Sequence, residues 1–292
     1  MENELWEYKL EGDAVCLLRL KKDVYEAQVP AMIDGRPVRI MEKKACLSKK
    51  KLRRVILPES IRQVGDWAFA YCNHLQEIVV ESEDIRFGRN VFLDCGELAR
   101  IFCRGKVGGM EELLAAAVCA MDAYYLLEPE AVGSLPWLEK WDARLGQLLK
   151  EPDRTGFSKL LLCGEEDYEG KDNDYDTFLT NKRKKKLRLA FLRLRYPLGL
   201  HAENKQELET YLRSYARNGE GAGLSWQLLV EEHGNEKDYF RIFTDSGCMT
   251  RENTEVFLLA AGGHPQLMAW VLAYKQENFG YEDIMDSFSL DF

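Results

Sequence analysis

Four histidines are the residues of this sequence that could most readily ligate a metal ion or transfer a proton. They are His74, His201, His233 and His264. No two of them lie within one helical turn, so neither a zinc-protease motif nor a comparable metal motif is present. We expect His74 to lie in a surface turn and His264 to link two helices. The histidines therefore predict no catalytic residue and no metal ligand.

Two glycine-containing segments resemble loops that cradle a phosphate. In the first, five residues separate Gly164 from Gly170, whereas a P-loop has four, and Asp172 stands where Ser or Thr is needed. The second segment, residues 219–223, lacks the preceding strand and the glycine spacing of a dinucleotide-binding loop. A nucleophile elbow of the G-x-S-x-G type is absent. We therefore expect no cofactor.

Residues 172–176, Asp-Asn-Asp-Tyr-Asp, imitate the start of an EF-hand calcium loop. The sixth position of such a loop requires glycine and the twelfth requires glutamate, but this sequence has Thr177 and Arg183. An EF-hand site is therefore not expected. A loose cation site at the surface is the alternative that the pattern leaves open.

Residues 182–188, Lys-Arg-Lys-Lys-Lys-Leu-Arg, form the densest charge cluster of the chain and are called the basic run below. One hypothesis is a contact with an anionic partner, which makes Lys184 and Lys185 candidate contact residues. The favoured interpretation is a solvated helix face, with the acidic residues 165–176 folding back to neutralise it. The chain has 40 Lys and Arg against 49 Asp and Glu, a net charge of −9, so a nucleic-acid partner is not expected.

The cysteines and the N-terminus bear on the cellular location. Eight cysteines are scattered along the chain without any C-x-x-C pair, which is typical of reduced, mostly buried thiols. The first residues carry no basic and apolar signal-peptide pattern. No run of about 18 apolar residues exists, so no membrane span is expected. These features predict a cytoplasmic protein.

The elements that would position any site begin with a 23-residue repeat in the first third of the chain. Its matching columns are Leu52, Leu75 and Leu98; Val55, Ile78 and Ile101; and Cys46, Phe69 and Phe92. Each unit has a short turn or helical piece, then a leucine, then an extended apolar run. One unit cannot bury its own apolar face, so stacking must form the core. Each buried aliphatic or aromatic side chain contributes about 1.5–3 kcal/mol to that core.

The repeat resembles a known family. Residues 29–38 are similar to the lead-in of BspA-type leucine-rich repeats, and residues 57–75 are similar to their unit. The likeness extends over about residues 8–104. The first copy departs from the pattern with Cys46 and three lysines at 49–51, and the third has Phe87 where Val64 stands. The resemblance implies a short solenoid that binds proteins or serves a structural role, without catalytic residues. Trp67, Tyr71 and His74 of the middle copy are the candidate contacts.

Residues 5–28 precede the repeats and include the apolar residues Leu17, Leu18, Leu20 and Val24. Gly12-Asp13 indicates a hairpin turn, and we expect the two strands to cap the open end of the stack. From Gly108 onward the apolar period is that of helices. The expected helices cover residues 111–127, 181–196 and 203–217, and a further helix runs from Ser134 as N-cap to its end at Pro152-Asp153.

A weaker repeat of 29 residues marks the end of the chain. It relates Gly234-Asn235 to Gly263-His264 and predicts two helix pairs, at 225–233 with 236–246 and at 251–262 with 265–277. The turns resemble those of degenerate ankyrin-type pairs, although the family's Thr-Pro-Leu-His turn is missing. Ordinary antiparallel helix packing is the equally weighted alternative.

Together these patterns predict two domains. The first, residues 1–106, is a short α/β leucine-rich-repeat solenoid with an N-terminal cap. The second, residues 107–292, is an all-α, helical-repeat-like domain with degenerate helix pairs over about 223–280. The expected function is a non-enzymatic scaffold that binds a protein partner and needs no cofactor. The alternatives are an enzyme or ligand-binding protein with its site in the helical domain, and nucleic-acid binding through the basic run.

Overall fold

A computed structural model describes residues 4–106, 108–157 and 174–280. The chain divides into two compact units. The first comprises Met1–Lys150 with Leu198–Leu200, and the second comprises Glu151–Pro197 with His201–Phe292. The predicted division near residue 106 coincides with the change from strands to helices, while the first unit continues through two helices to Lys150.

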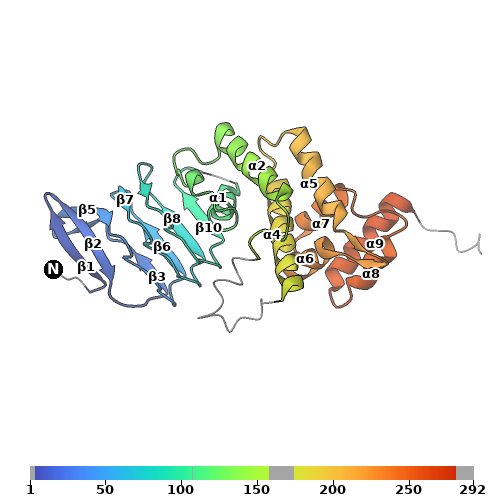
Figure 1. Ribbon diagram of the computed structural model, residues 1–292, viewed down its shortest axis with the longest axis horizontal. Coiled ribbons are helices and arrows are strands. Elements are labelled where there is room, and N and C mark those ends of the chain that lie inside the picture. Colours follow the sequence, from blue (N-terminus) through green and yellow to red (C-terminus); the bar gives the residue numbers. More distant parts are fainter. Residues whose placement is uncertain (1–3, 107, 158–173, 281–292) are drawn as a thin grey trace, which may run out of the picture. The chain divides into compact units, whose positions relative to one another are not determined.

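The first unit begins with ten short strands that form two sheets (Figure 1). The strands are β1 (Trp6–Glu11), β2 (Ala14–Leu20), β3 (Glu26–Gln28), β4 (Met32–Ile33), β5 (Arg36–Met41), β6 (Arg54–Leu57), β7 (Gln63–Val64), β8 (Glu77–Val80), β9 (Arg86–Phe87) and β10 (Arg100–Cys103). One sheet has the order β1-β2-β5-β7-β9, with β4 beside β5, and the other has the order β10-β8-β6-β3. The chain alternates between the two sheets, as a solenoid requires.

The 23-residue period is the register of the parallel strands. Val55 of β6 stands opposite Ile78 of β8, and Ile78 stands opposite Ile101 of β10. All three side chains are buried, as are the leucines at 52, 75 and 98. Phe69 and Phe92 stack with their ring centroids 5.7 Å apart. The predicted solenoid is therefore confirmed, and identical columns of side chains form its core.

The turns between strands form a third ladder, which holds successive coils together through backbone hydrogen bonds. The amides of Trp67, Phe69 and Tyr71 donate to the carbonyls of Arg89, Val91 and Leu93 at 3.0, 3.0 and 2.7 Å. One coil earlier, the amides of Lys44, Cys46 and Ser48 donate to the carbonyls of Asp66, Ala68 and Ala70 at 3.0, 2.7 and 2.9 Å. Two columns of residues adopt the left-handed backbone conformation that this turn needs. The first column is Lys44, Trp67 and Asn90, with φ of 61°, 54° and 52°. The second is Ser48, Tyr71 and Asp94, with φ of 56°, 60° and 53°.

Two glycines, again 23 residues apart, allow the coils to approach closely. A Cβ on Gly65 would lie 2.5 Å from the backbone nitrogen of Lys43, and a Cβ on Gly88 would lie 2.5 Å from that of Asp66. The amide of Gly65 also donates to the carbonyl of Met41 at 2.8 Å. Any other residue at these positions would push neighbouring coils apart.

The ends of the stack are covered differently in the two sheets. The β1–β2 hairpin turns at Gly12 (φ 64°) and lies antiparallel at one end of the larger sheet, which confirms the predicted cap. At the other end, α1 (Met110–Cys119) packs on β10 of the smaller sheet. No strand among the described residues pairs with the outer edge of β9 in the larger sheet.

The helical continuation of this unit departs from the prediction. A single helix over 111–127 is wrong, because α1 ends at Cys119 and the chain turns at Asp122, which has a φ of 51°. A short 3-10 helix, η1 (Tyr124–Leu126), follows. The next helix, α2 (Leu135–Lys150), begins as predicted: the Trp137 amide donates to the Ser134 hydroxyl at 3.4 Å.

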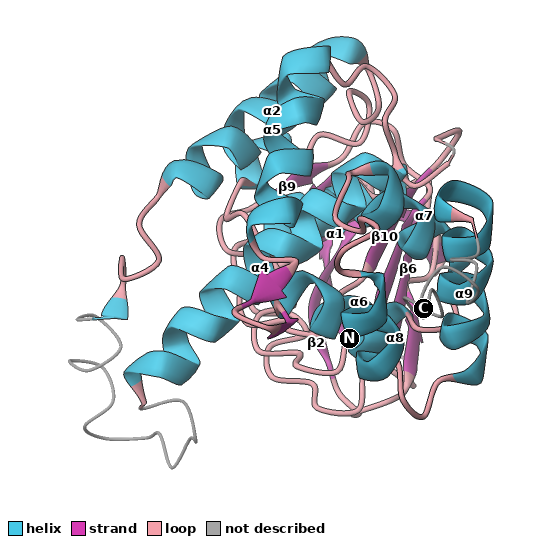
Figure 2. Ribbon diagram, turned by 90° about the vertical axis from the view of Figure 1, so that its right-hand side faces the viewer, coloured by secondary structure: helices cyan, strands magenta, loops and turns pink. Residues whose placement is uncertain are grey.

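The second unit is helical apart from one small hairpin (Figure 2). It contains α4 (Tyr175–Arg195), α5 (Ala202–Ser214), β11 (Arg217–Asn218), β12 (Gly221–Ala222), α6 (Leu224–His233), α7 (Lys237–Asp245), α8 (Thr254–Ala260) and α9 (Pro265–Phe279). The α4 helix begins six residues earlier than predicted, because Asp174 caps it by accepting from the Thr177 amide at 3.1 Å. Among the described residues, the all-α prediction for this region is therefore confirmed in its main features.

The four final helices lie close to the ranges predicted for them, with α6 in contact with α7 and α8 in contact with α9. The turn of the first pair touches that of the second, since a Cβ on Gly234 would lie 3.2 Å from Nδ1 of His264. Trp226 of α6 packs on Phe243 of α7 and Phe257 of α8, with ring centroids 5.3 and 4.9 Å apart. The pairs thus share one aromatic core. Whether they are ankyrin repeats stays a prediction.

The close approach at Gly65 generates a test of the solenoid. We expect Gly65→Ala to lower the free energy of unfolding by about 1–3 kcal/mol, because the new methyl group meets backbone that cannot rotate away. Gly96→Ala is the matched control, since no atom lies within 4 Å of its Cβ position. Urea unfolding followed by circular dichroism measures both variants, and equal stabilities would contradict the proposed packing.

Candidate interaction surfaces

The outer side of the sheet β3-β6-β8-β10 carries a row of paired charges. Alternation along each strand points one residue inward and the next outward. Arg54 lies between Glu26 and Glu77, at 3.4 and 2.7 Å, and Arg100 lies 3.4 Å from Glu77. These ion pairs connect neighbouring coils. Because they are exposed, each contributes only about 0–1 kcal/mol to the free energy of unfolding. The row is therefore an ordered and nearly neutral surface.

A second row on the same side is apolar. Ile56 stands opposite Val79, and Val79 stands opposite Phe102, each two residues beyond a member of the charged row. All three side chains are half-buried, whereas their strand neighbours Val55 and Ile78 are fully buried. We call Ile56, Val79 and Phe102 the apolar row. It is a continuous strip of hydrophobic surface on a rigid support.

His74, one of the predicted contacts, lies just before β8. Its Nδ1 lies 2.6 Å from Oε1 of Glu97, and Oε2 of Glu97 accepts from the side-chain amide of Gln76 at 3.0 Å. These two hydrogen bonds hold the pKa of Glu97 below its usual range, and the one with His74 has the larger effect. The imidazole is exposed, as expected, and its role within the chain is to connect two adjacent coils.

Trp67 and Tyr71, the other predicted contacts in this coil, lie in the turn ladder. Tyr71 is 42% exposed, so it is available to a partner. Trp67 is only half-exposed, and the Lys44 ammonium lies 5.8 Å from its ring centroid. Their left-handed backbone was not visible in the sequence, because neither residue type favours it. A contact role for these residues stays a prediction.

The basic run is not the solvated face that the sequence favoured. Carboxylates outside the acidic segment pair with it: Lys182 with Glu151 at 3.7 Å, Arg183 with Asp153 at 2.9 Å, Lys184 with Glu231 at 2.6 Å, Lys186 with Asp153 at 2.7 Å and Arg188 with Glu232 at 2.5 Å. Lys185 also interacts within the chain. Residues 165–173, the predicted neutralising partners, lie outside the described residues. The basic run therefore organises the second unit, which argues against a free anion-binding role for Lys184 and Lys185.

Asp153 is central to this cluster. Burial alone would raise the pKa of its carboxyl group, but hydrogen bonds from Lys186 and Arg183 outweigh burial and lower that pKa. The Lys186 side chain is only 4% exposed and also donates to the Glu151 carbonyl at 2.5 Å. A buried ammonium group is stable in the folded protein only while its partner carboxylate compensates its charge.

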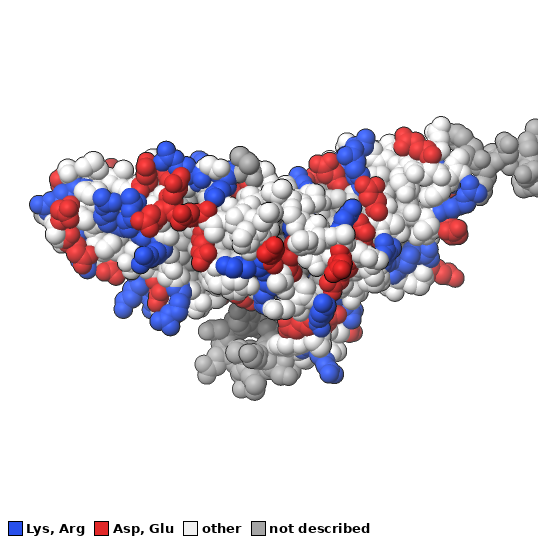
Figure 3. Space-filling view, turned by 90° about the horizontal axis from the view of Figure 1, so that it is seen from above, with Lys and Arg blue, Asp and Glu red and all other residues white. Residues whose placement is uncertain are grey.

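Charge is mixed elsewhere on the surface as well. Figure 3 shows basic and acidic side chains interspersed on the face that it presents. No group of three or more His, Cys, Asp or Glu within the described ranges is placed to hold a metal ion. In the same part of the chain, no helix is both long and apolar enough to cross a membrane.

The buried thiols of the described residues are poor nucleophiles. Burial raises the pKa of Cys72 to about 11 and those of Cys16 and Cys103 to about 12. The Cys72 and Cys95 thiols donate to the carbonyls of Cys46 and Phe69, both at 3.1 Å, and so repeat the 23-residue period. These cysteines are structural elements of the coils.

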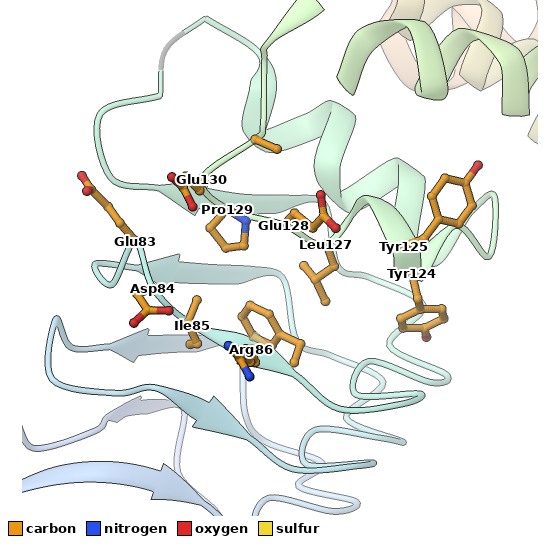
Figure 4. A pocket seen from close by; sticks show the side chains of 12 residues that line it. Glu83, Asp84, Ile85, Arg86, Tyr124, Tyr125, Leu127, Glu128, Pro129 and Glu130 are labelled. Atoms are coloured by element: carbon orange, nitrogen blue, oxygen red, sulfur yellow. The ribbon is translucent and has the colours of Figure 1, made fainter. Parts of the chain in front are cut away.

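A groove that the sequence did not reveal lies beside β9, within the first unit (Figure 4). Its volume is about 760 Å³. One wall comprises residues 83–87, and the other comprises Tyr124, Tyr125 and residues 127–131. Its lining includes the buried apolar residues Ile85 and Leu127 and four carboxylates: Glu83, Asp84, Glu128 and Glu130. The walls are some forty residues apart in the chain and follow no motif, so no sequence signal connects them.

Comparison with known proteins agrees with the geometry. Residues 37–114 match the family model of the BspA type leucine rich repeat region. One similar solved structure is a leucine-rich repeat protein of T. pallidum, with 30% identity and a TM-score of 0.33; the match covers 35% of this chain and 48% of that one. Another is a leucine-rich repeat protein of Bacteroides capillosus, with 23% identity and a TM-score of 0.32; the match covers 37% of this chain and 83% of that one. A third is a leucine-rich cell surface protein of Faecalibacterium prausnitzii, with 20% identity and a TM-score of 0.32; the match covers 34% of this chain and 29% of that one. The chain thus spans about half the length of the first structure. No curated protein matches the sequence significantly.

The parallel coils and their repeated leucines define the first part of this chain as a leucine-rich-repeat solenoid. Within that class, residues 37–114 match the family model of the BspA type leucine rich repeat region.

The cluster around Asp153 predicts a pH-dependent stability. We expect Asp153→Asn to lower the free energy of unfolding by about 3 kcal/mol at pH 7, because it leaves the Lys186 ammonium buried beside a neutral group. The folded-state pKa of Asp153 is lowered, so its contribution is complete above the ordinary Asp pKa and is lost as the pH falls through the folded value. Urea unfolding at pH 7 and pH 3 should show the difference between wild type and variant shrinking at pH 3.

Glu151→Gln is the control for this measurement, since its carboxylate pairs with Lys182 at 3.7 Å and lies farther from the buried ammonium. Glu151→Gln should lower the free energy of unfolding by less than about 1 kcal/mol. Equal losses for the two variants, or a pH-independent difference for Asp153→Asn, would refute the assignment.

The raised thiol pKa values predict slow alkylation. At pH 8, iodoacetamide should label Cys72 and Cys103 at least about tenfold more slowly in the native protein than in urea, since the thiolate is the reactive form. Mass spectrometry of the digested protein measures each site. Native labelling as fast as denatured labelling would contradict the burial of these thiols.

Proposed function

We propose that this protein is a non-enzymatic interaction scaffold whose repeat region binds a protein partner through the outer side of the sheet β3-β6-β8-β10. The observation that carries this proposal is the apolar row of Ile56, Val79 and Phe102. Repeat proteins present extended surfaces of this kind. Leucine-rich repeats commonly mediate contacts between proteins, and the family match supports the same role here.

The physical argument is pre-organisation. The three apolar side chains project from hydrogen-bonded strands, so binding would cost little conformational entropy in this chain. The neighbouring charges already pair with one another along the sheet. A partner can therefore cover the apolar row while the ion pairs remain at its rim, where charges need not be fully desolvated.

The other candidate functions have weaker support. Nucleic-acid binding would need the basic run, whose lysines and arginines pair with Asp153, Glu231 and Glu232. For an enzyme site in the helical unit, burial raises the pKa of Cys248 to about 12, which makes that one thiol a poor nucleophile. The cytoplasmic location expected from the cysteines stays a prediction.

The apolar row can be tested by substitution. We expect Val79→Glu to abolish capture of the proteins that the wild type retains from a lysate of its own cells, because a carboxylate would be buried in the interface. Leu259→Glu is the matched control, since Leu259 is 81% exposed on α8. Quantitative mass spectrometry of the captured proteins is the measurement.

A second variant guards against a folding defect. Val79→Thr keeps the branched shape of the side chain and should weaken the same captures partially, while circular dichroism stays unchanged. Proteins captured equally by wild type, Val79→Glu and Leu259→Glu would show that this sheet is not the binding surface.

A further inference from the structure

We propose that the groove beside β9 binds an extended basic peptide segment, which adds to the larger sheet as its next strand. This surface is distinct from the apolar row. Three observations support the proposal: an open strand edge, a groove along that edge and an unbalanced negative charge.

The open edge follows from the coil register. In β9 the amides of Arg86 and Gly88 donate to the carbonyls of Arg62 and Val64, at 2.9 and 2.8 Å. Because successive residues of a strand point to opposite sides, the backbone groups of Phe87 point away from β7. The carbonyls of Ile85 and Phe87 are the equivalents, 23 residues later, of the Arg62 and Val64 carbonyls that accept from β9. If another coil followed β9, its strand would donate hydrogen bonds to them in the same way.

Within the described residues, the larger sheet has no further coil. No described residue pairs with β9 on this side, and none in the described ranges donates to the carbonyl of Ile85 or Phe87. The smaller sheet ends differently, since α1 covers β10. An exposed strand edge of this kind is a template for a segment from another chain.

The groove leaves room for such a segment. Its volume of about 760 Å³ lies between the edge of β9 and residues 124–131 (Figure 4). This volume falls within the range of about 300–1,000 Å³ typical of ligand sites. Ile85, Phe87 and Leu127 offer apolar contacts, and the half-buried Tyr124 adds an aromatic ring. Alternate side chains of an added strand would face these apolar residues.

The charge of the groove selects a basic occupant. Asp84 lies 3.7 Å from Arg62, but Glu83, Glu128 and Glu130 have no ion-pair partner among the described residues. Arg86 is the single basic residue of the lining, and the Lys106 ammonium donates to the Glu130 backbone carbonyl rather than to its carboxylate. Lysine or arginine side chains at alternate positions would pair with the three free carboxylates. A metal ion is the poorer candidate, because these carboxylates do not converge on one point.

The test uses the full chain and a fluorescein-labelled peptide of four Lys-Val repeats, with binding followed by fluorescence anisotropy. We expect saturable binding that weakens as salt is raised, and no binding of the matching Glu-Val peptide. Glu128→Lys should weaken binding at least about fivefold by reversing one wall charge. Glu220→Lys, in the exposed turn between β11 and β12, makes the same change in net charge and should have no effect.

Strand addition has its own control in the peptide. Two versions are N-methylated on alternate residues, one at the lysines and one at the valines. Only one set of amides can face β9, so one version should lose binding and the other should keep it. Equal affinity of both versions, full competition by spermine, or no binding at low salt would overturn the proposal.

The outcome is separable from that of the proposed function. Val79→Glu should leave binding of the Lys-Val peptide unchanged, because the substitution lies on the other sheet. Loss of peptide binding in Val79→Glu with intact circular dichroism would count against a separate groove site.

Discussion

The backbone register between coils 23 residues apart is the constraint on which the rest of the first unit depends. It fixes which strand residues oppose each other, as Val55 and Ile78 do, and which turn amides meet which carbonyls. The same register requires a left-handed residue at Trp67 and Tyr71 and a close backbone approach at Gly65. Core packing, turn conformation and glycine placement are therefore consequences of one repeated geometry, and none of them would be stable in an isolated coil.

This geometry also determines what the surface can do. Parallel strands in register align equivalent side chains in rows, so a single outward position per coil becomes a strip that crosses the sheet. One strip consists of ion pairs between neighbouring coils, and the next is the apolar row. Where the repeat stops, the same alignment leaves the carbonyls of Ile85 and Phe87 facing a groove. Both candidate surfaces are thus products of the repeat, one of its continuity and the other of its end.

The sequence predicted what is local or periodic and failed where distant segments meet. The columns of leucine and isoleucine gave the strand register directly, and Ser134 and Pro197 marked helix ends correctly. The helix over 111–127 was wrong, because an apolar composition cannot reveal the left-handed turn at Asp122. The basic run was misjudged because its partners, such as Asp153 and Glu232, lie 30 to 44 residues away. The groove beside β9 was missed for the same reason.

Hydrogen exchange of single amides in the native protein tests the central claim most directly. If the coils stabilise each other in register, the amides of Phe69 and Tyr71 in the turn ladder should exchange with the same opening free energy as those of Ile78 and Val80 in β8. Their protection should fall together as urea is added. Fast, urea-independent exchange of the turn amides beside protected strand amides would show that the turns are not part of the cooperative stack, and would contradict the account.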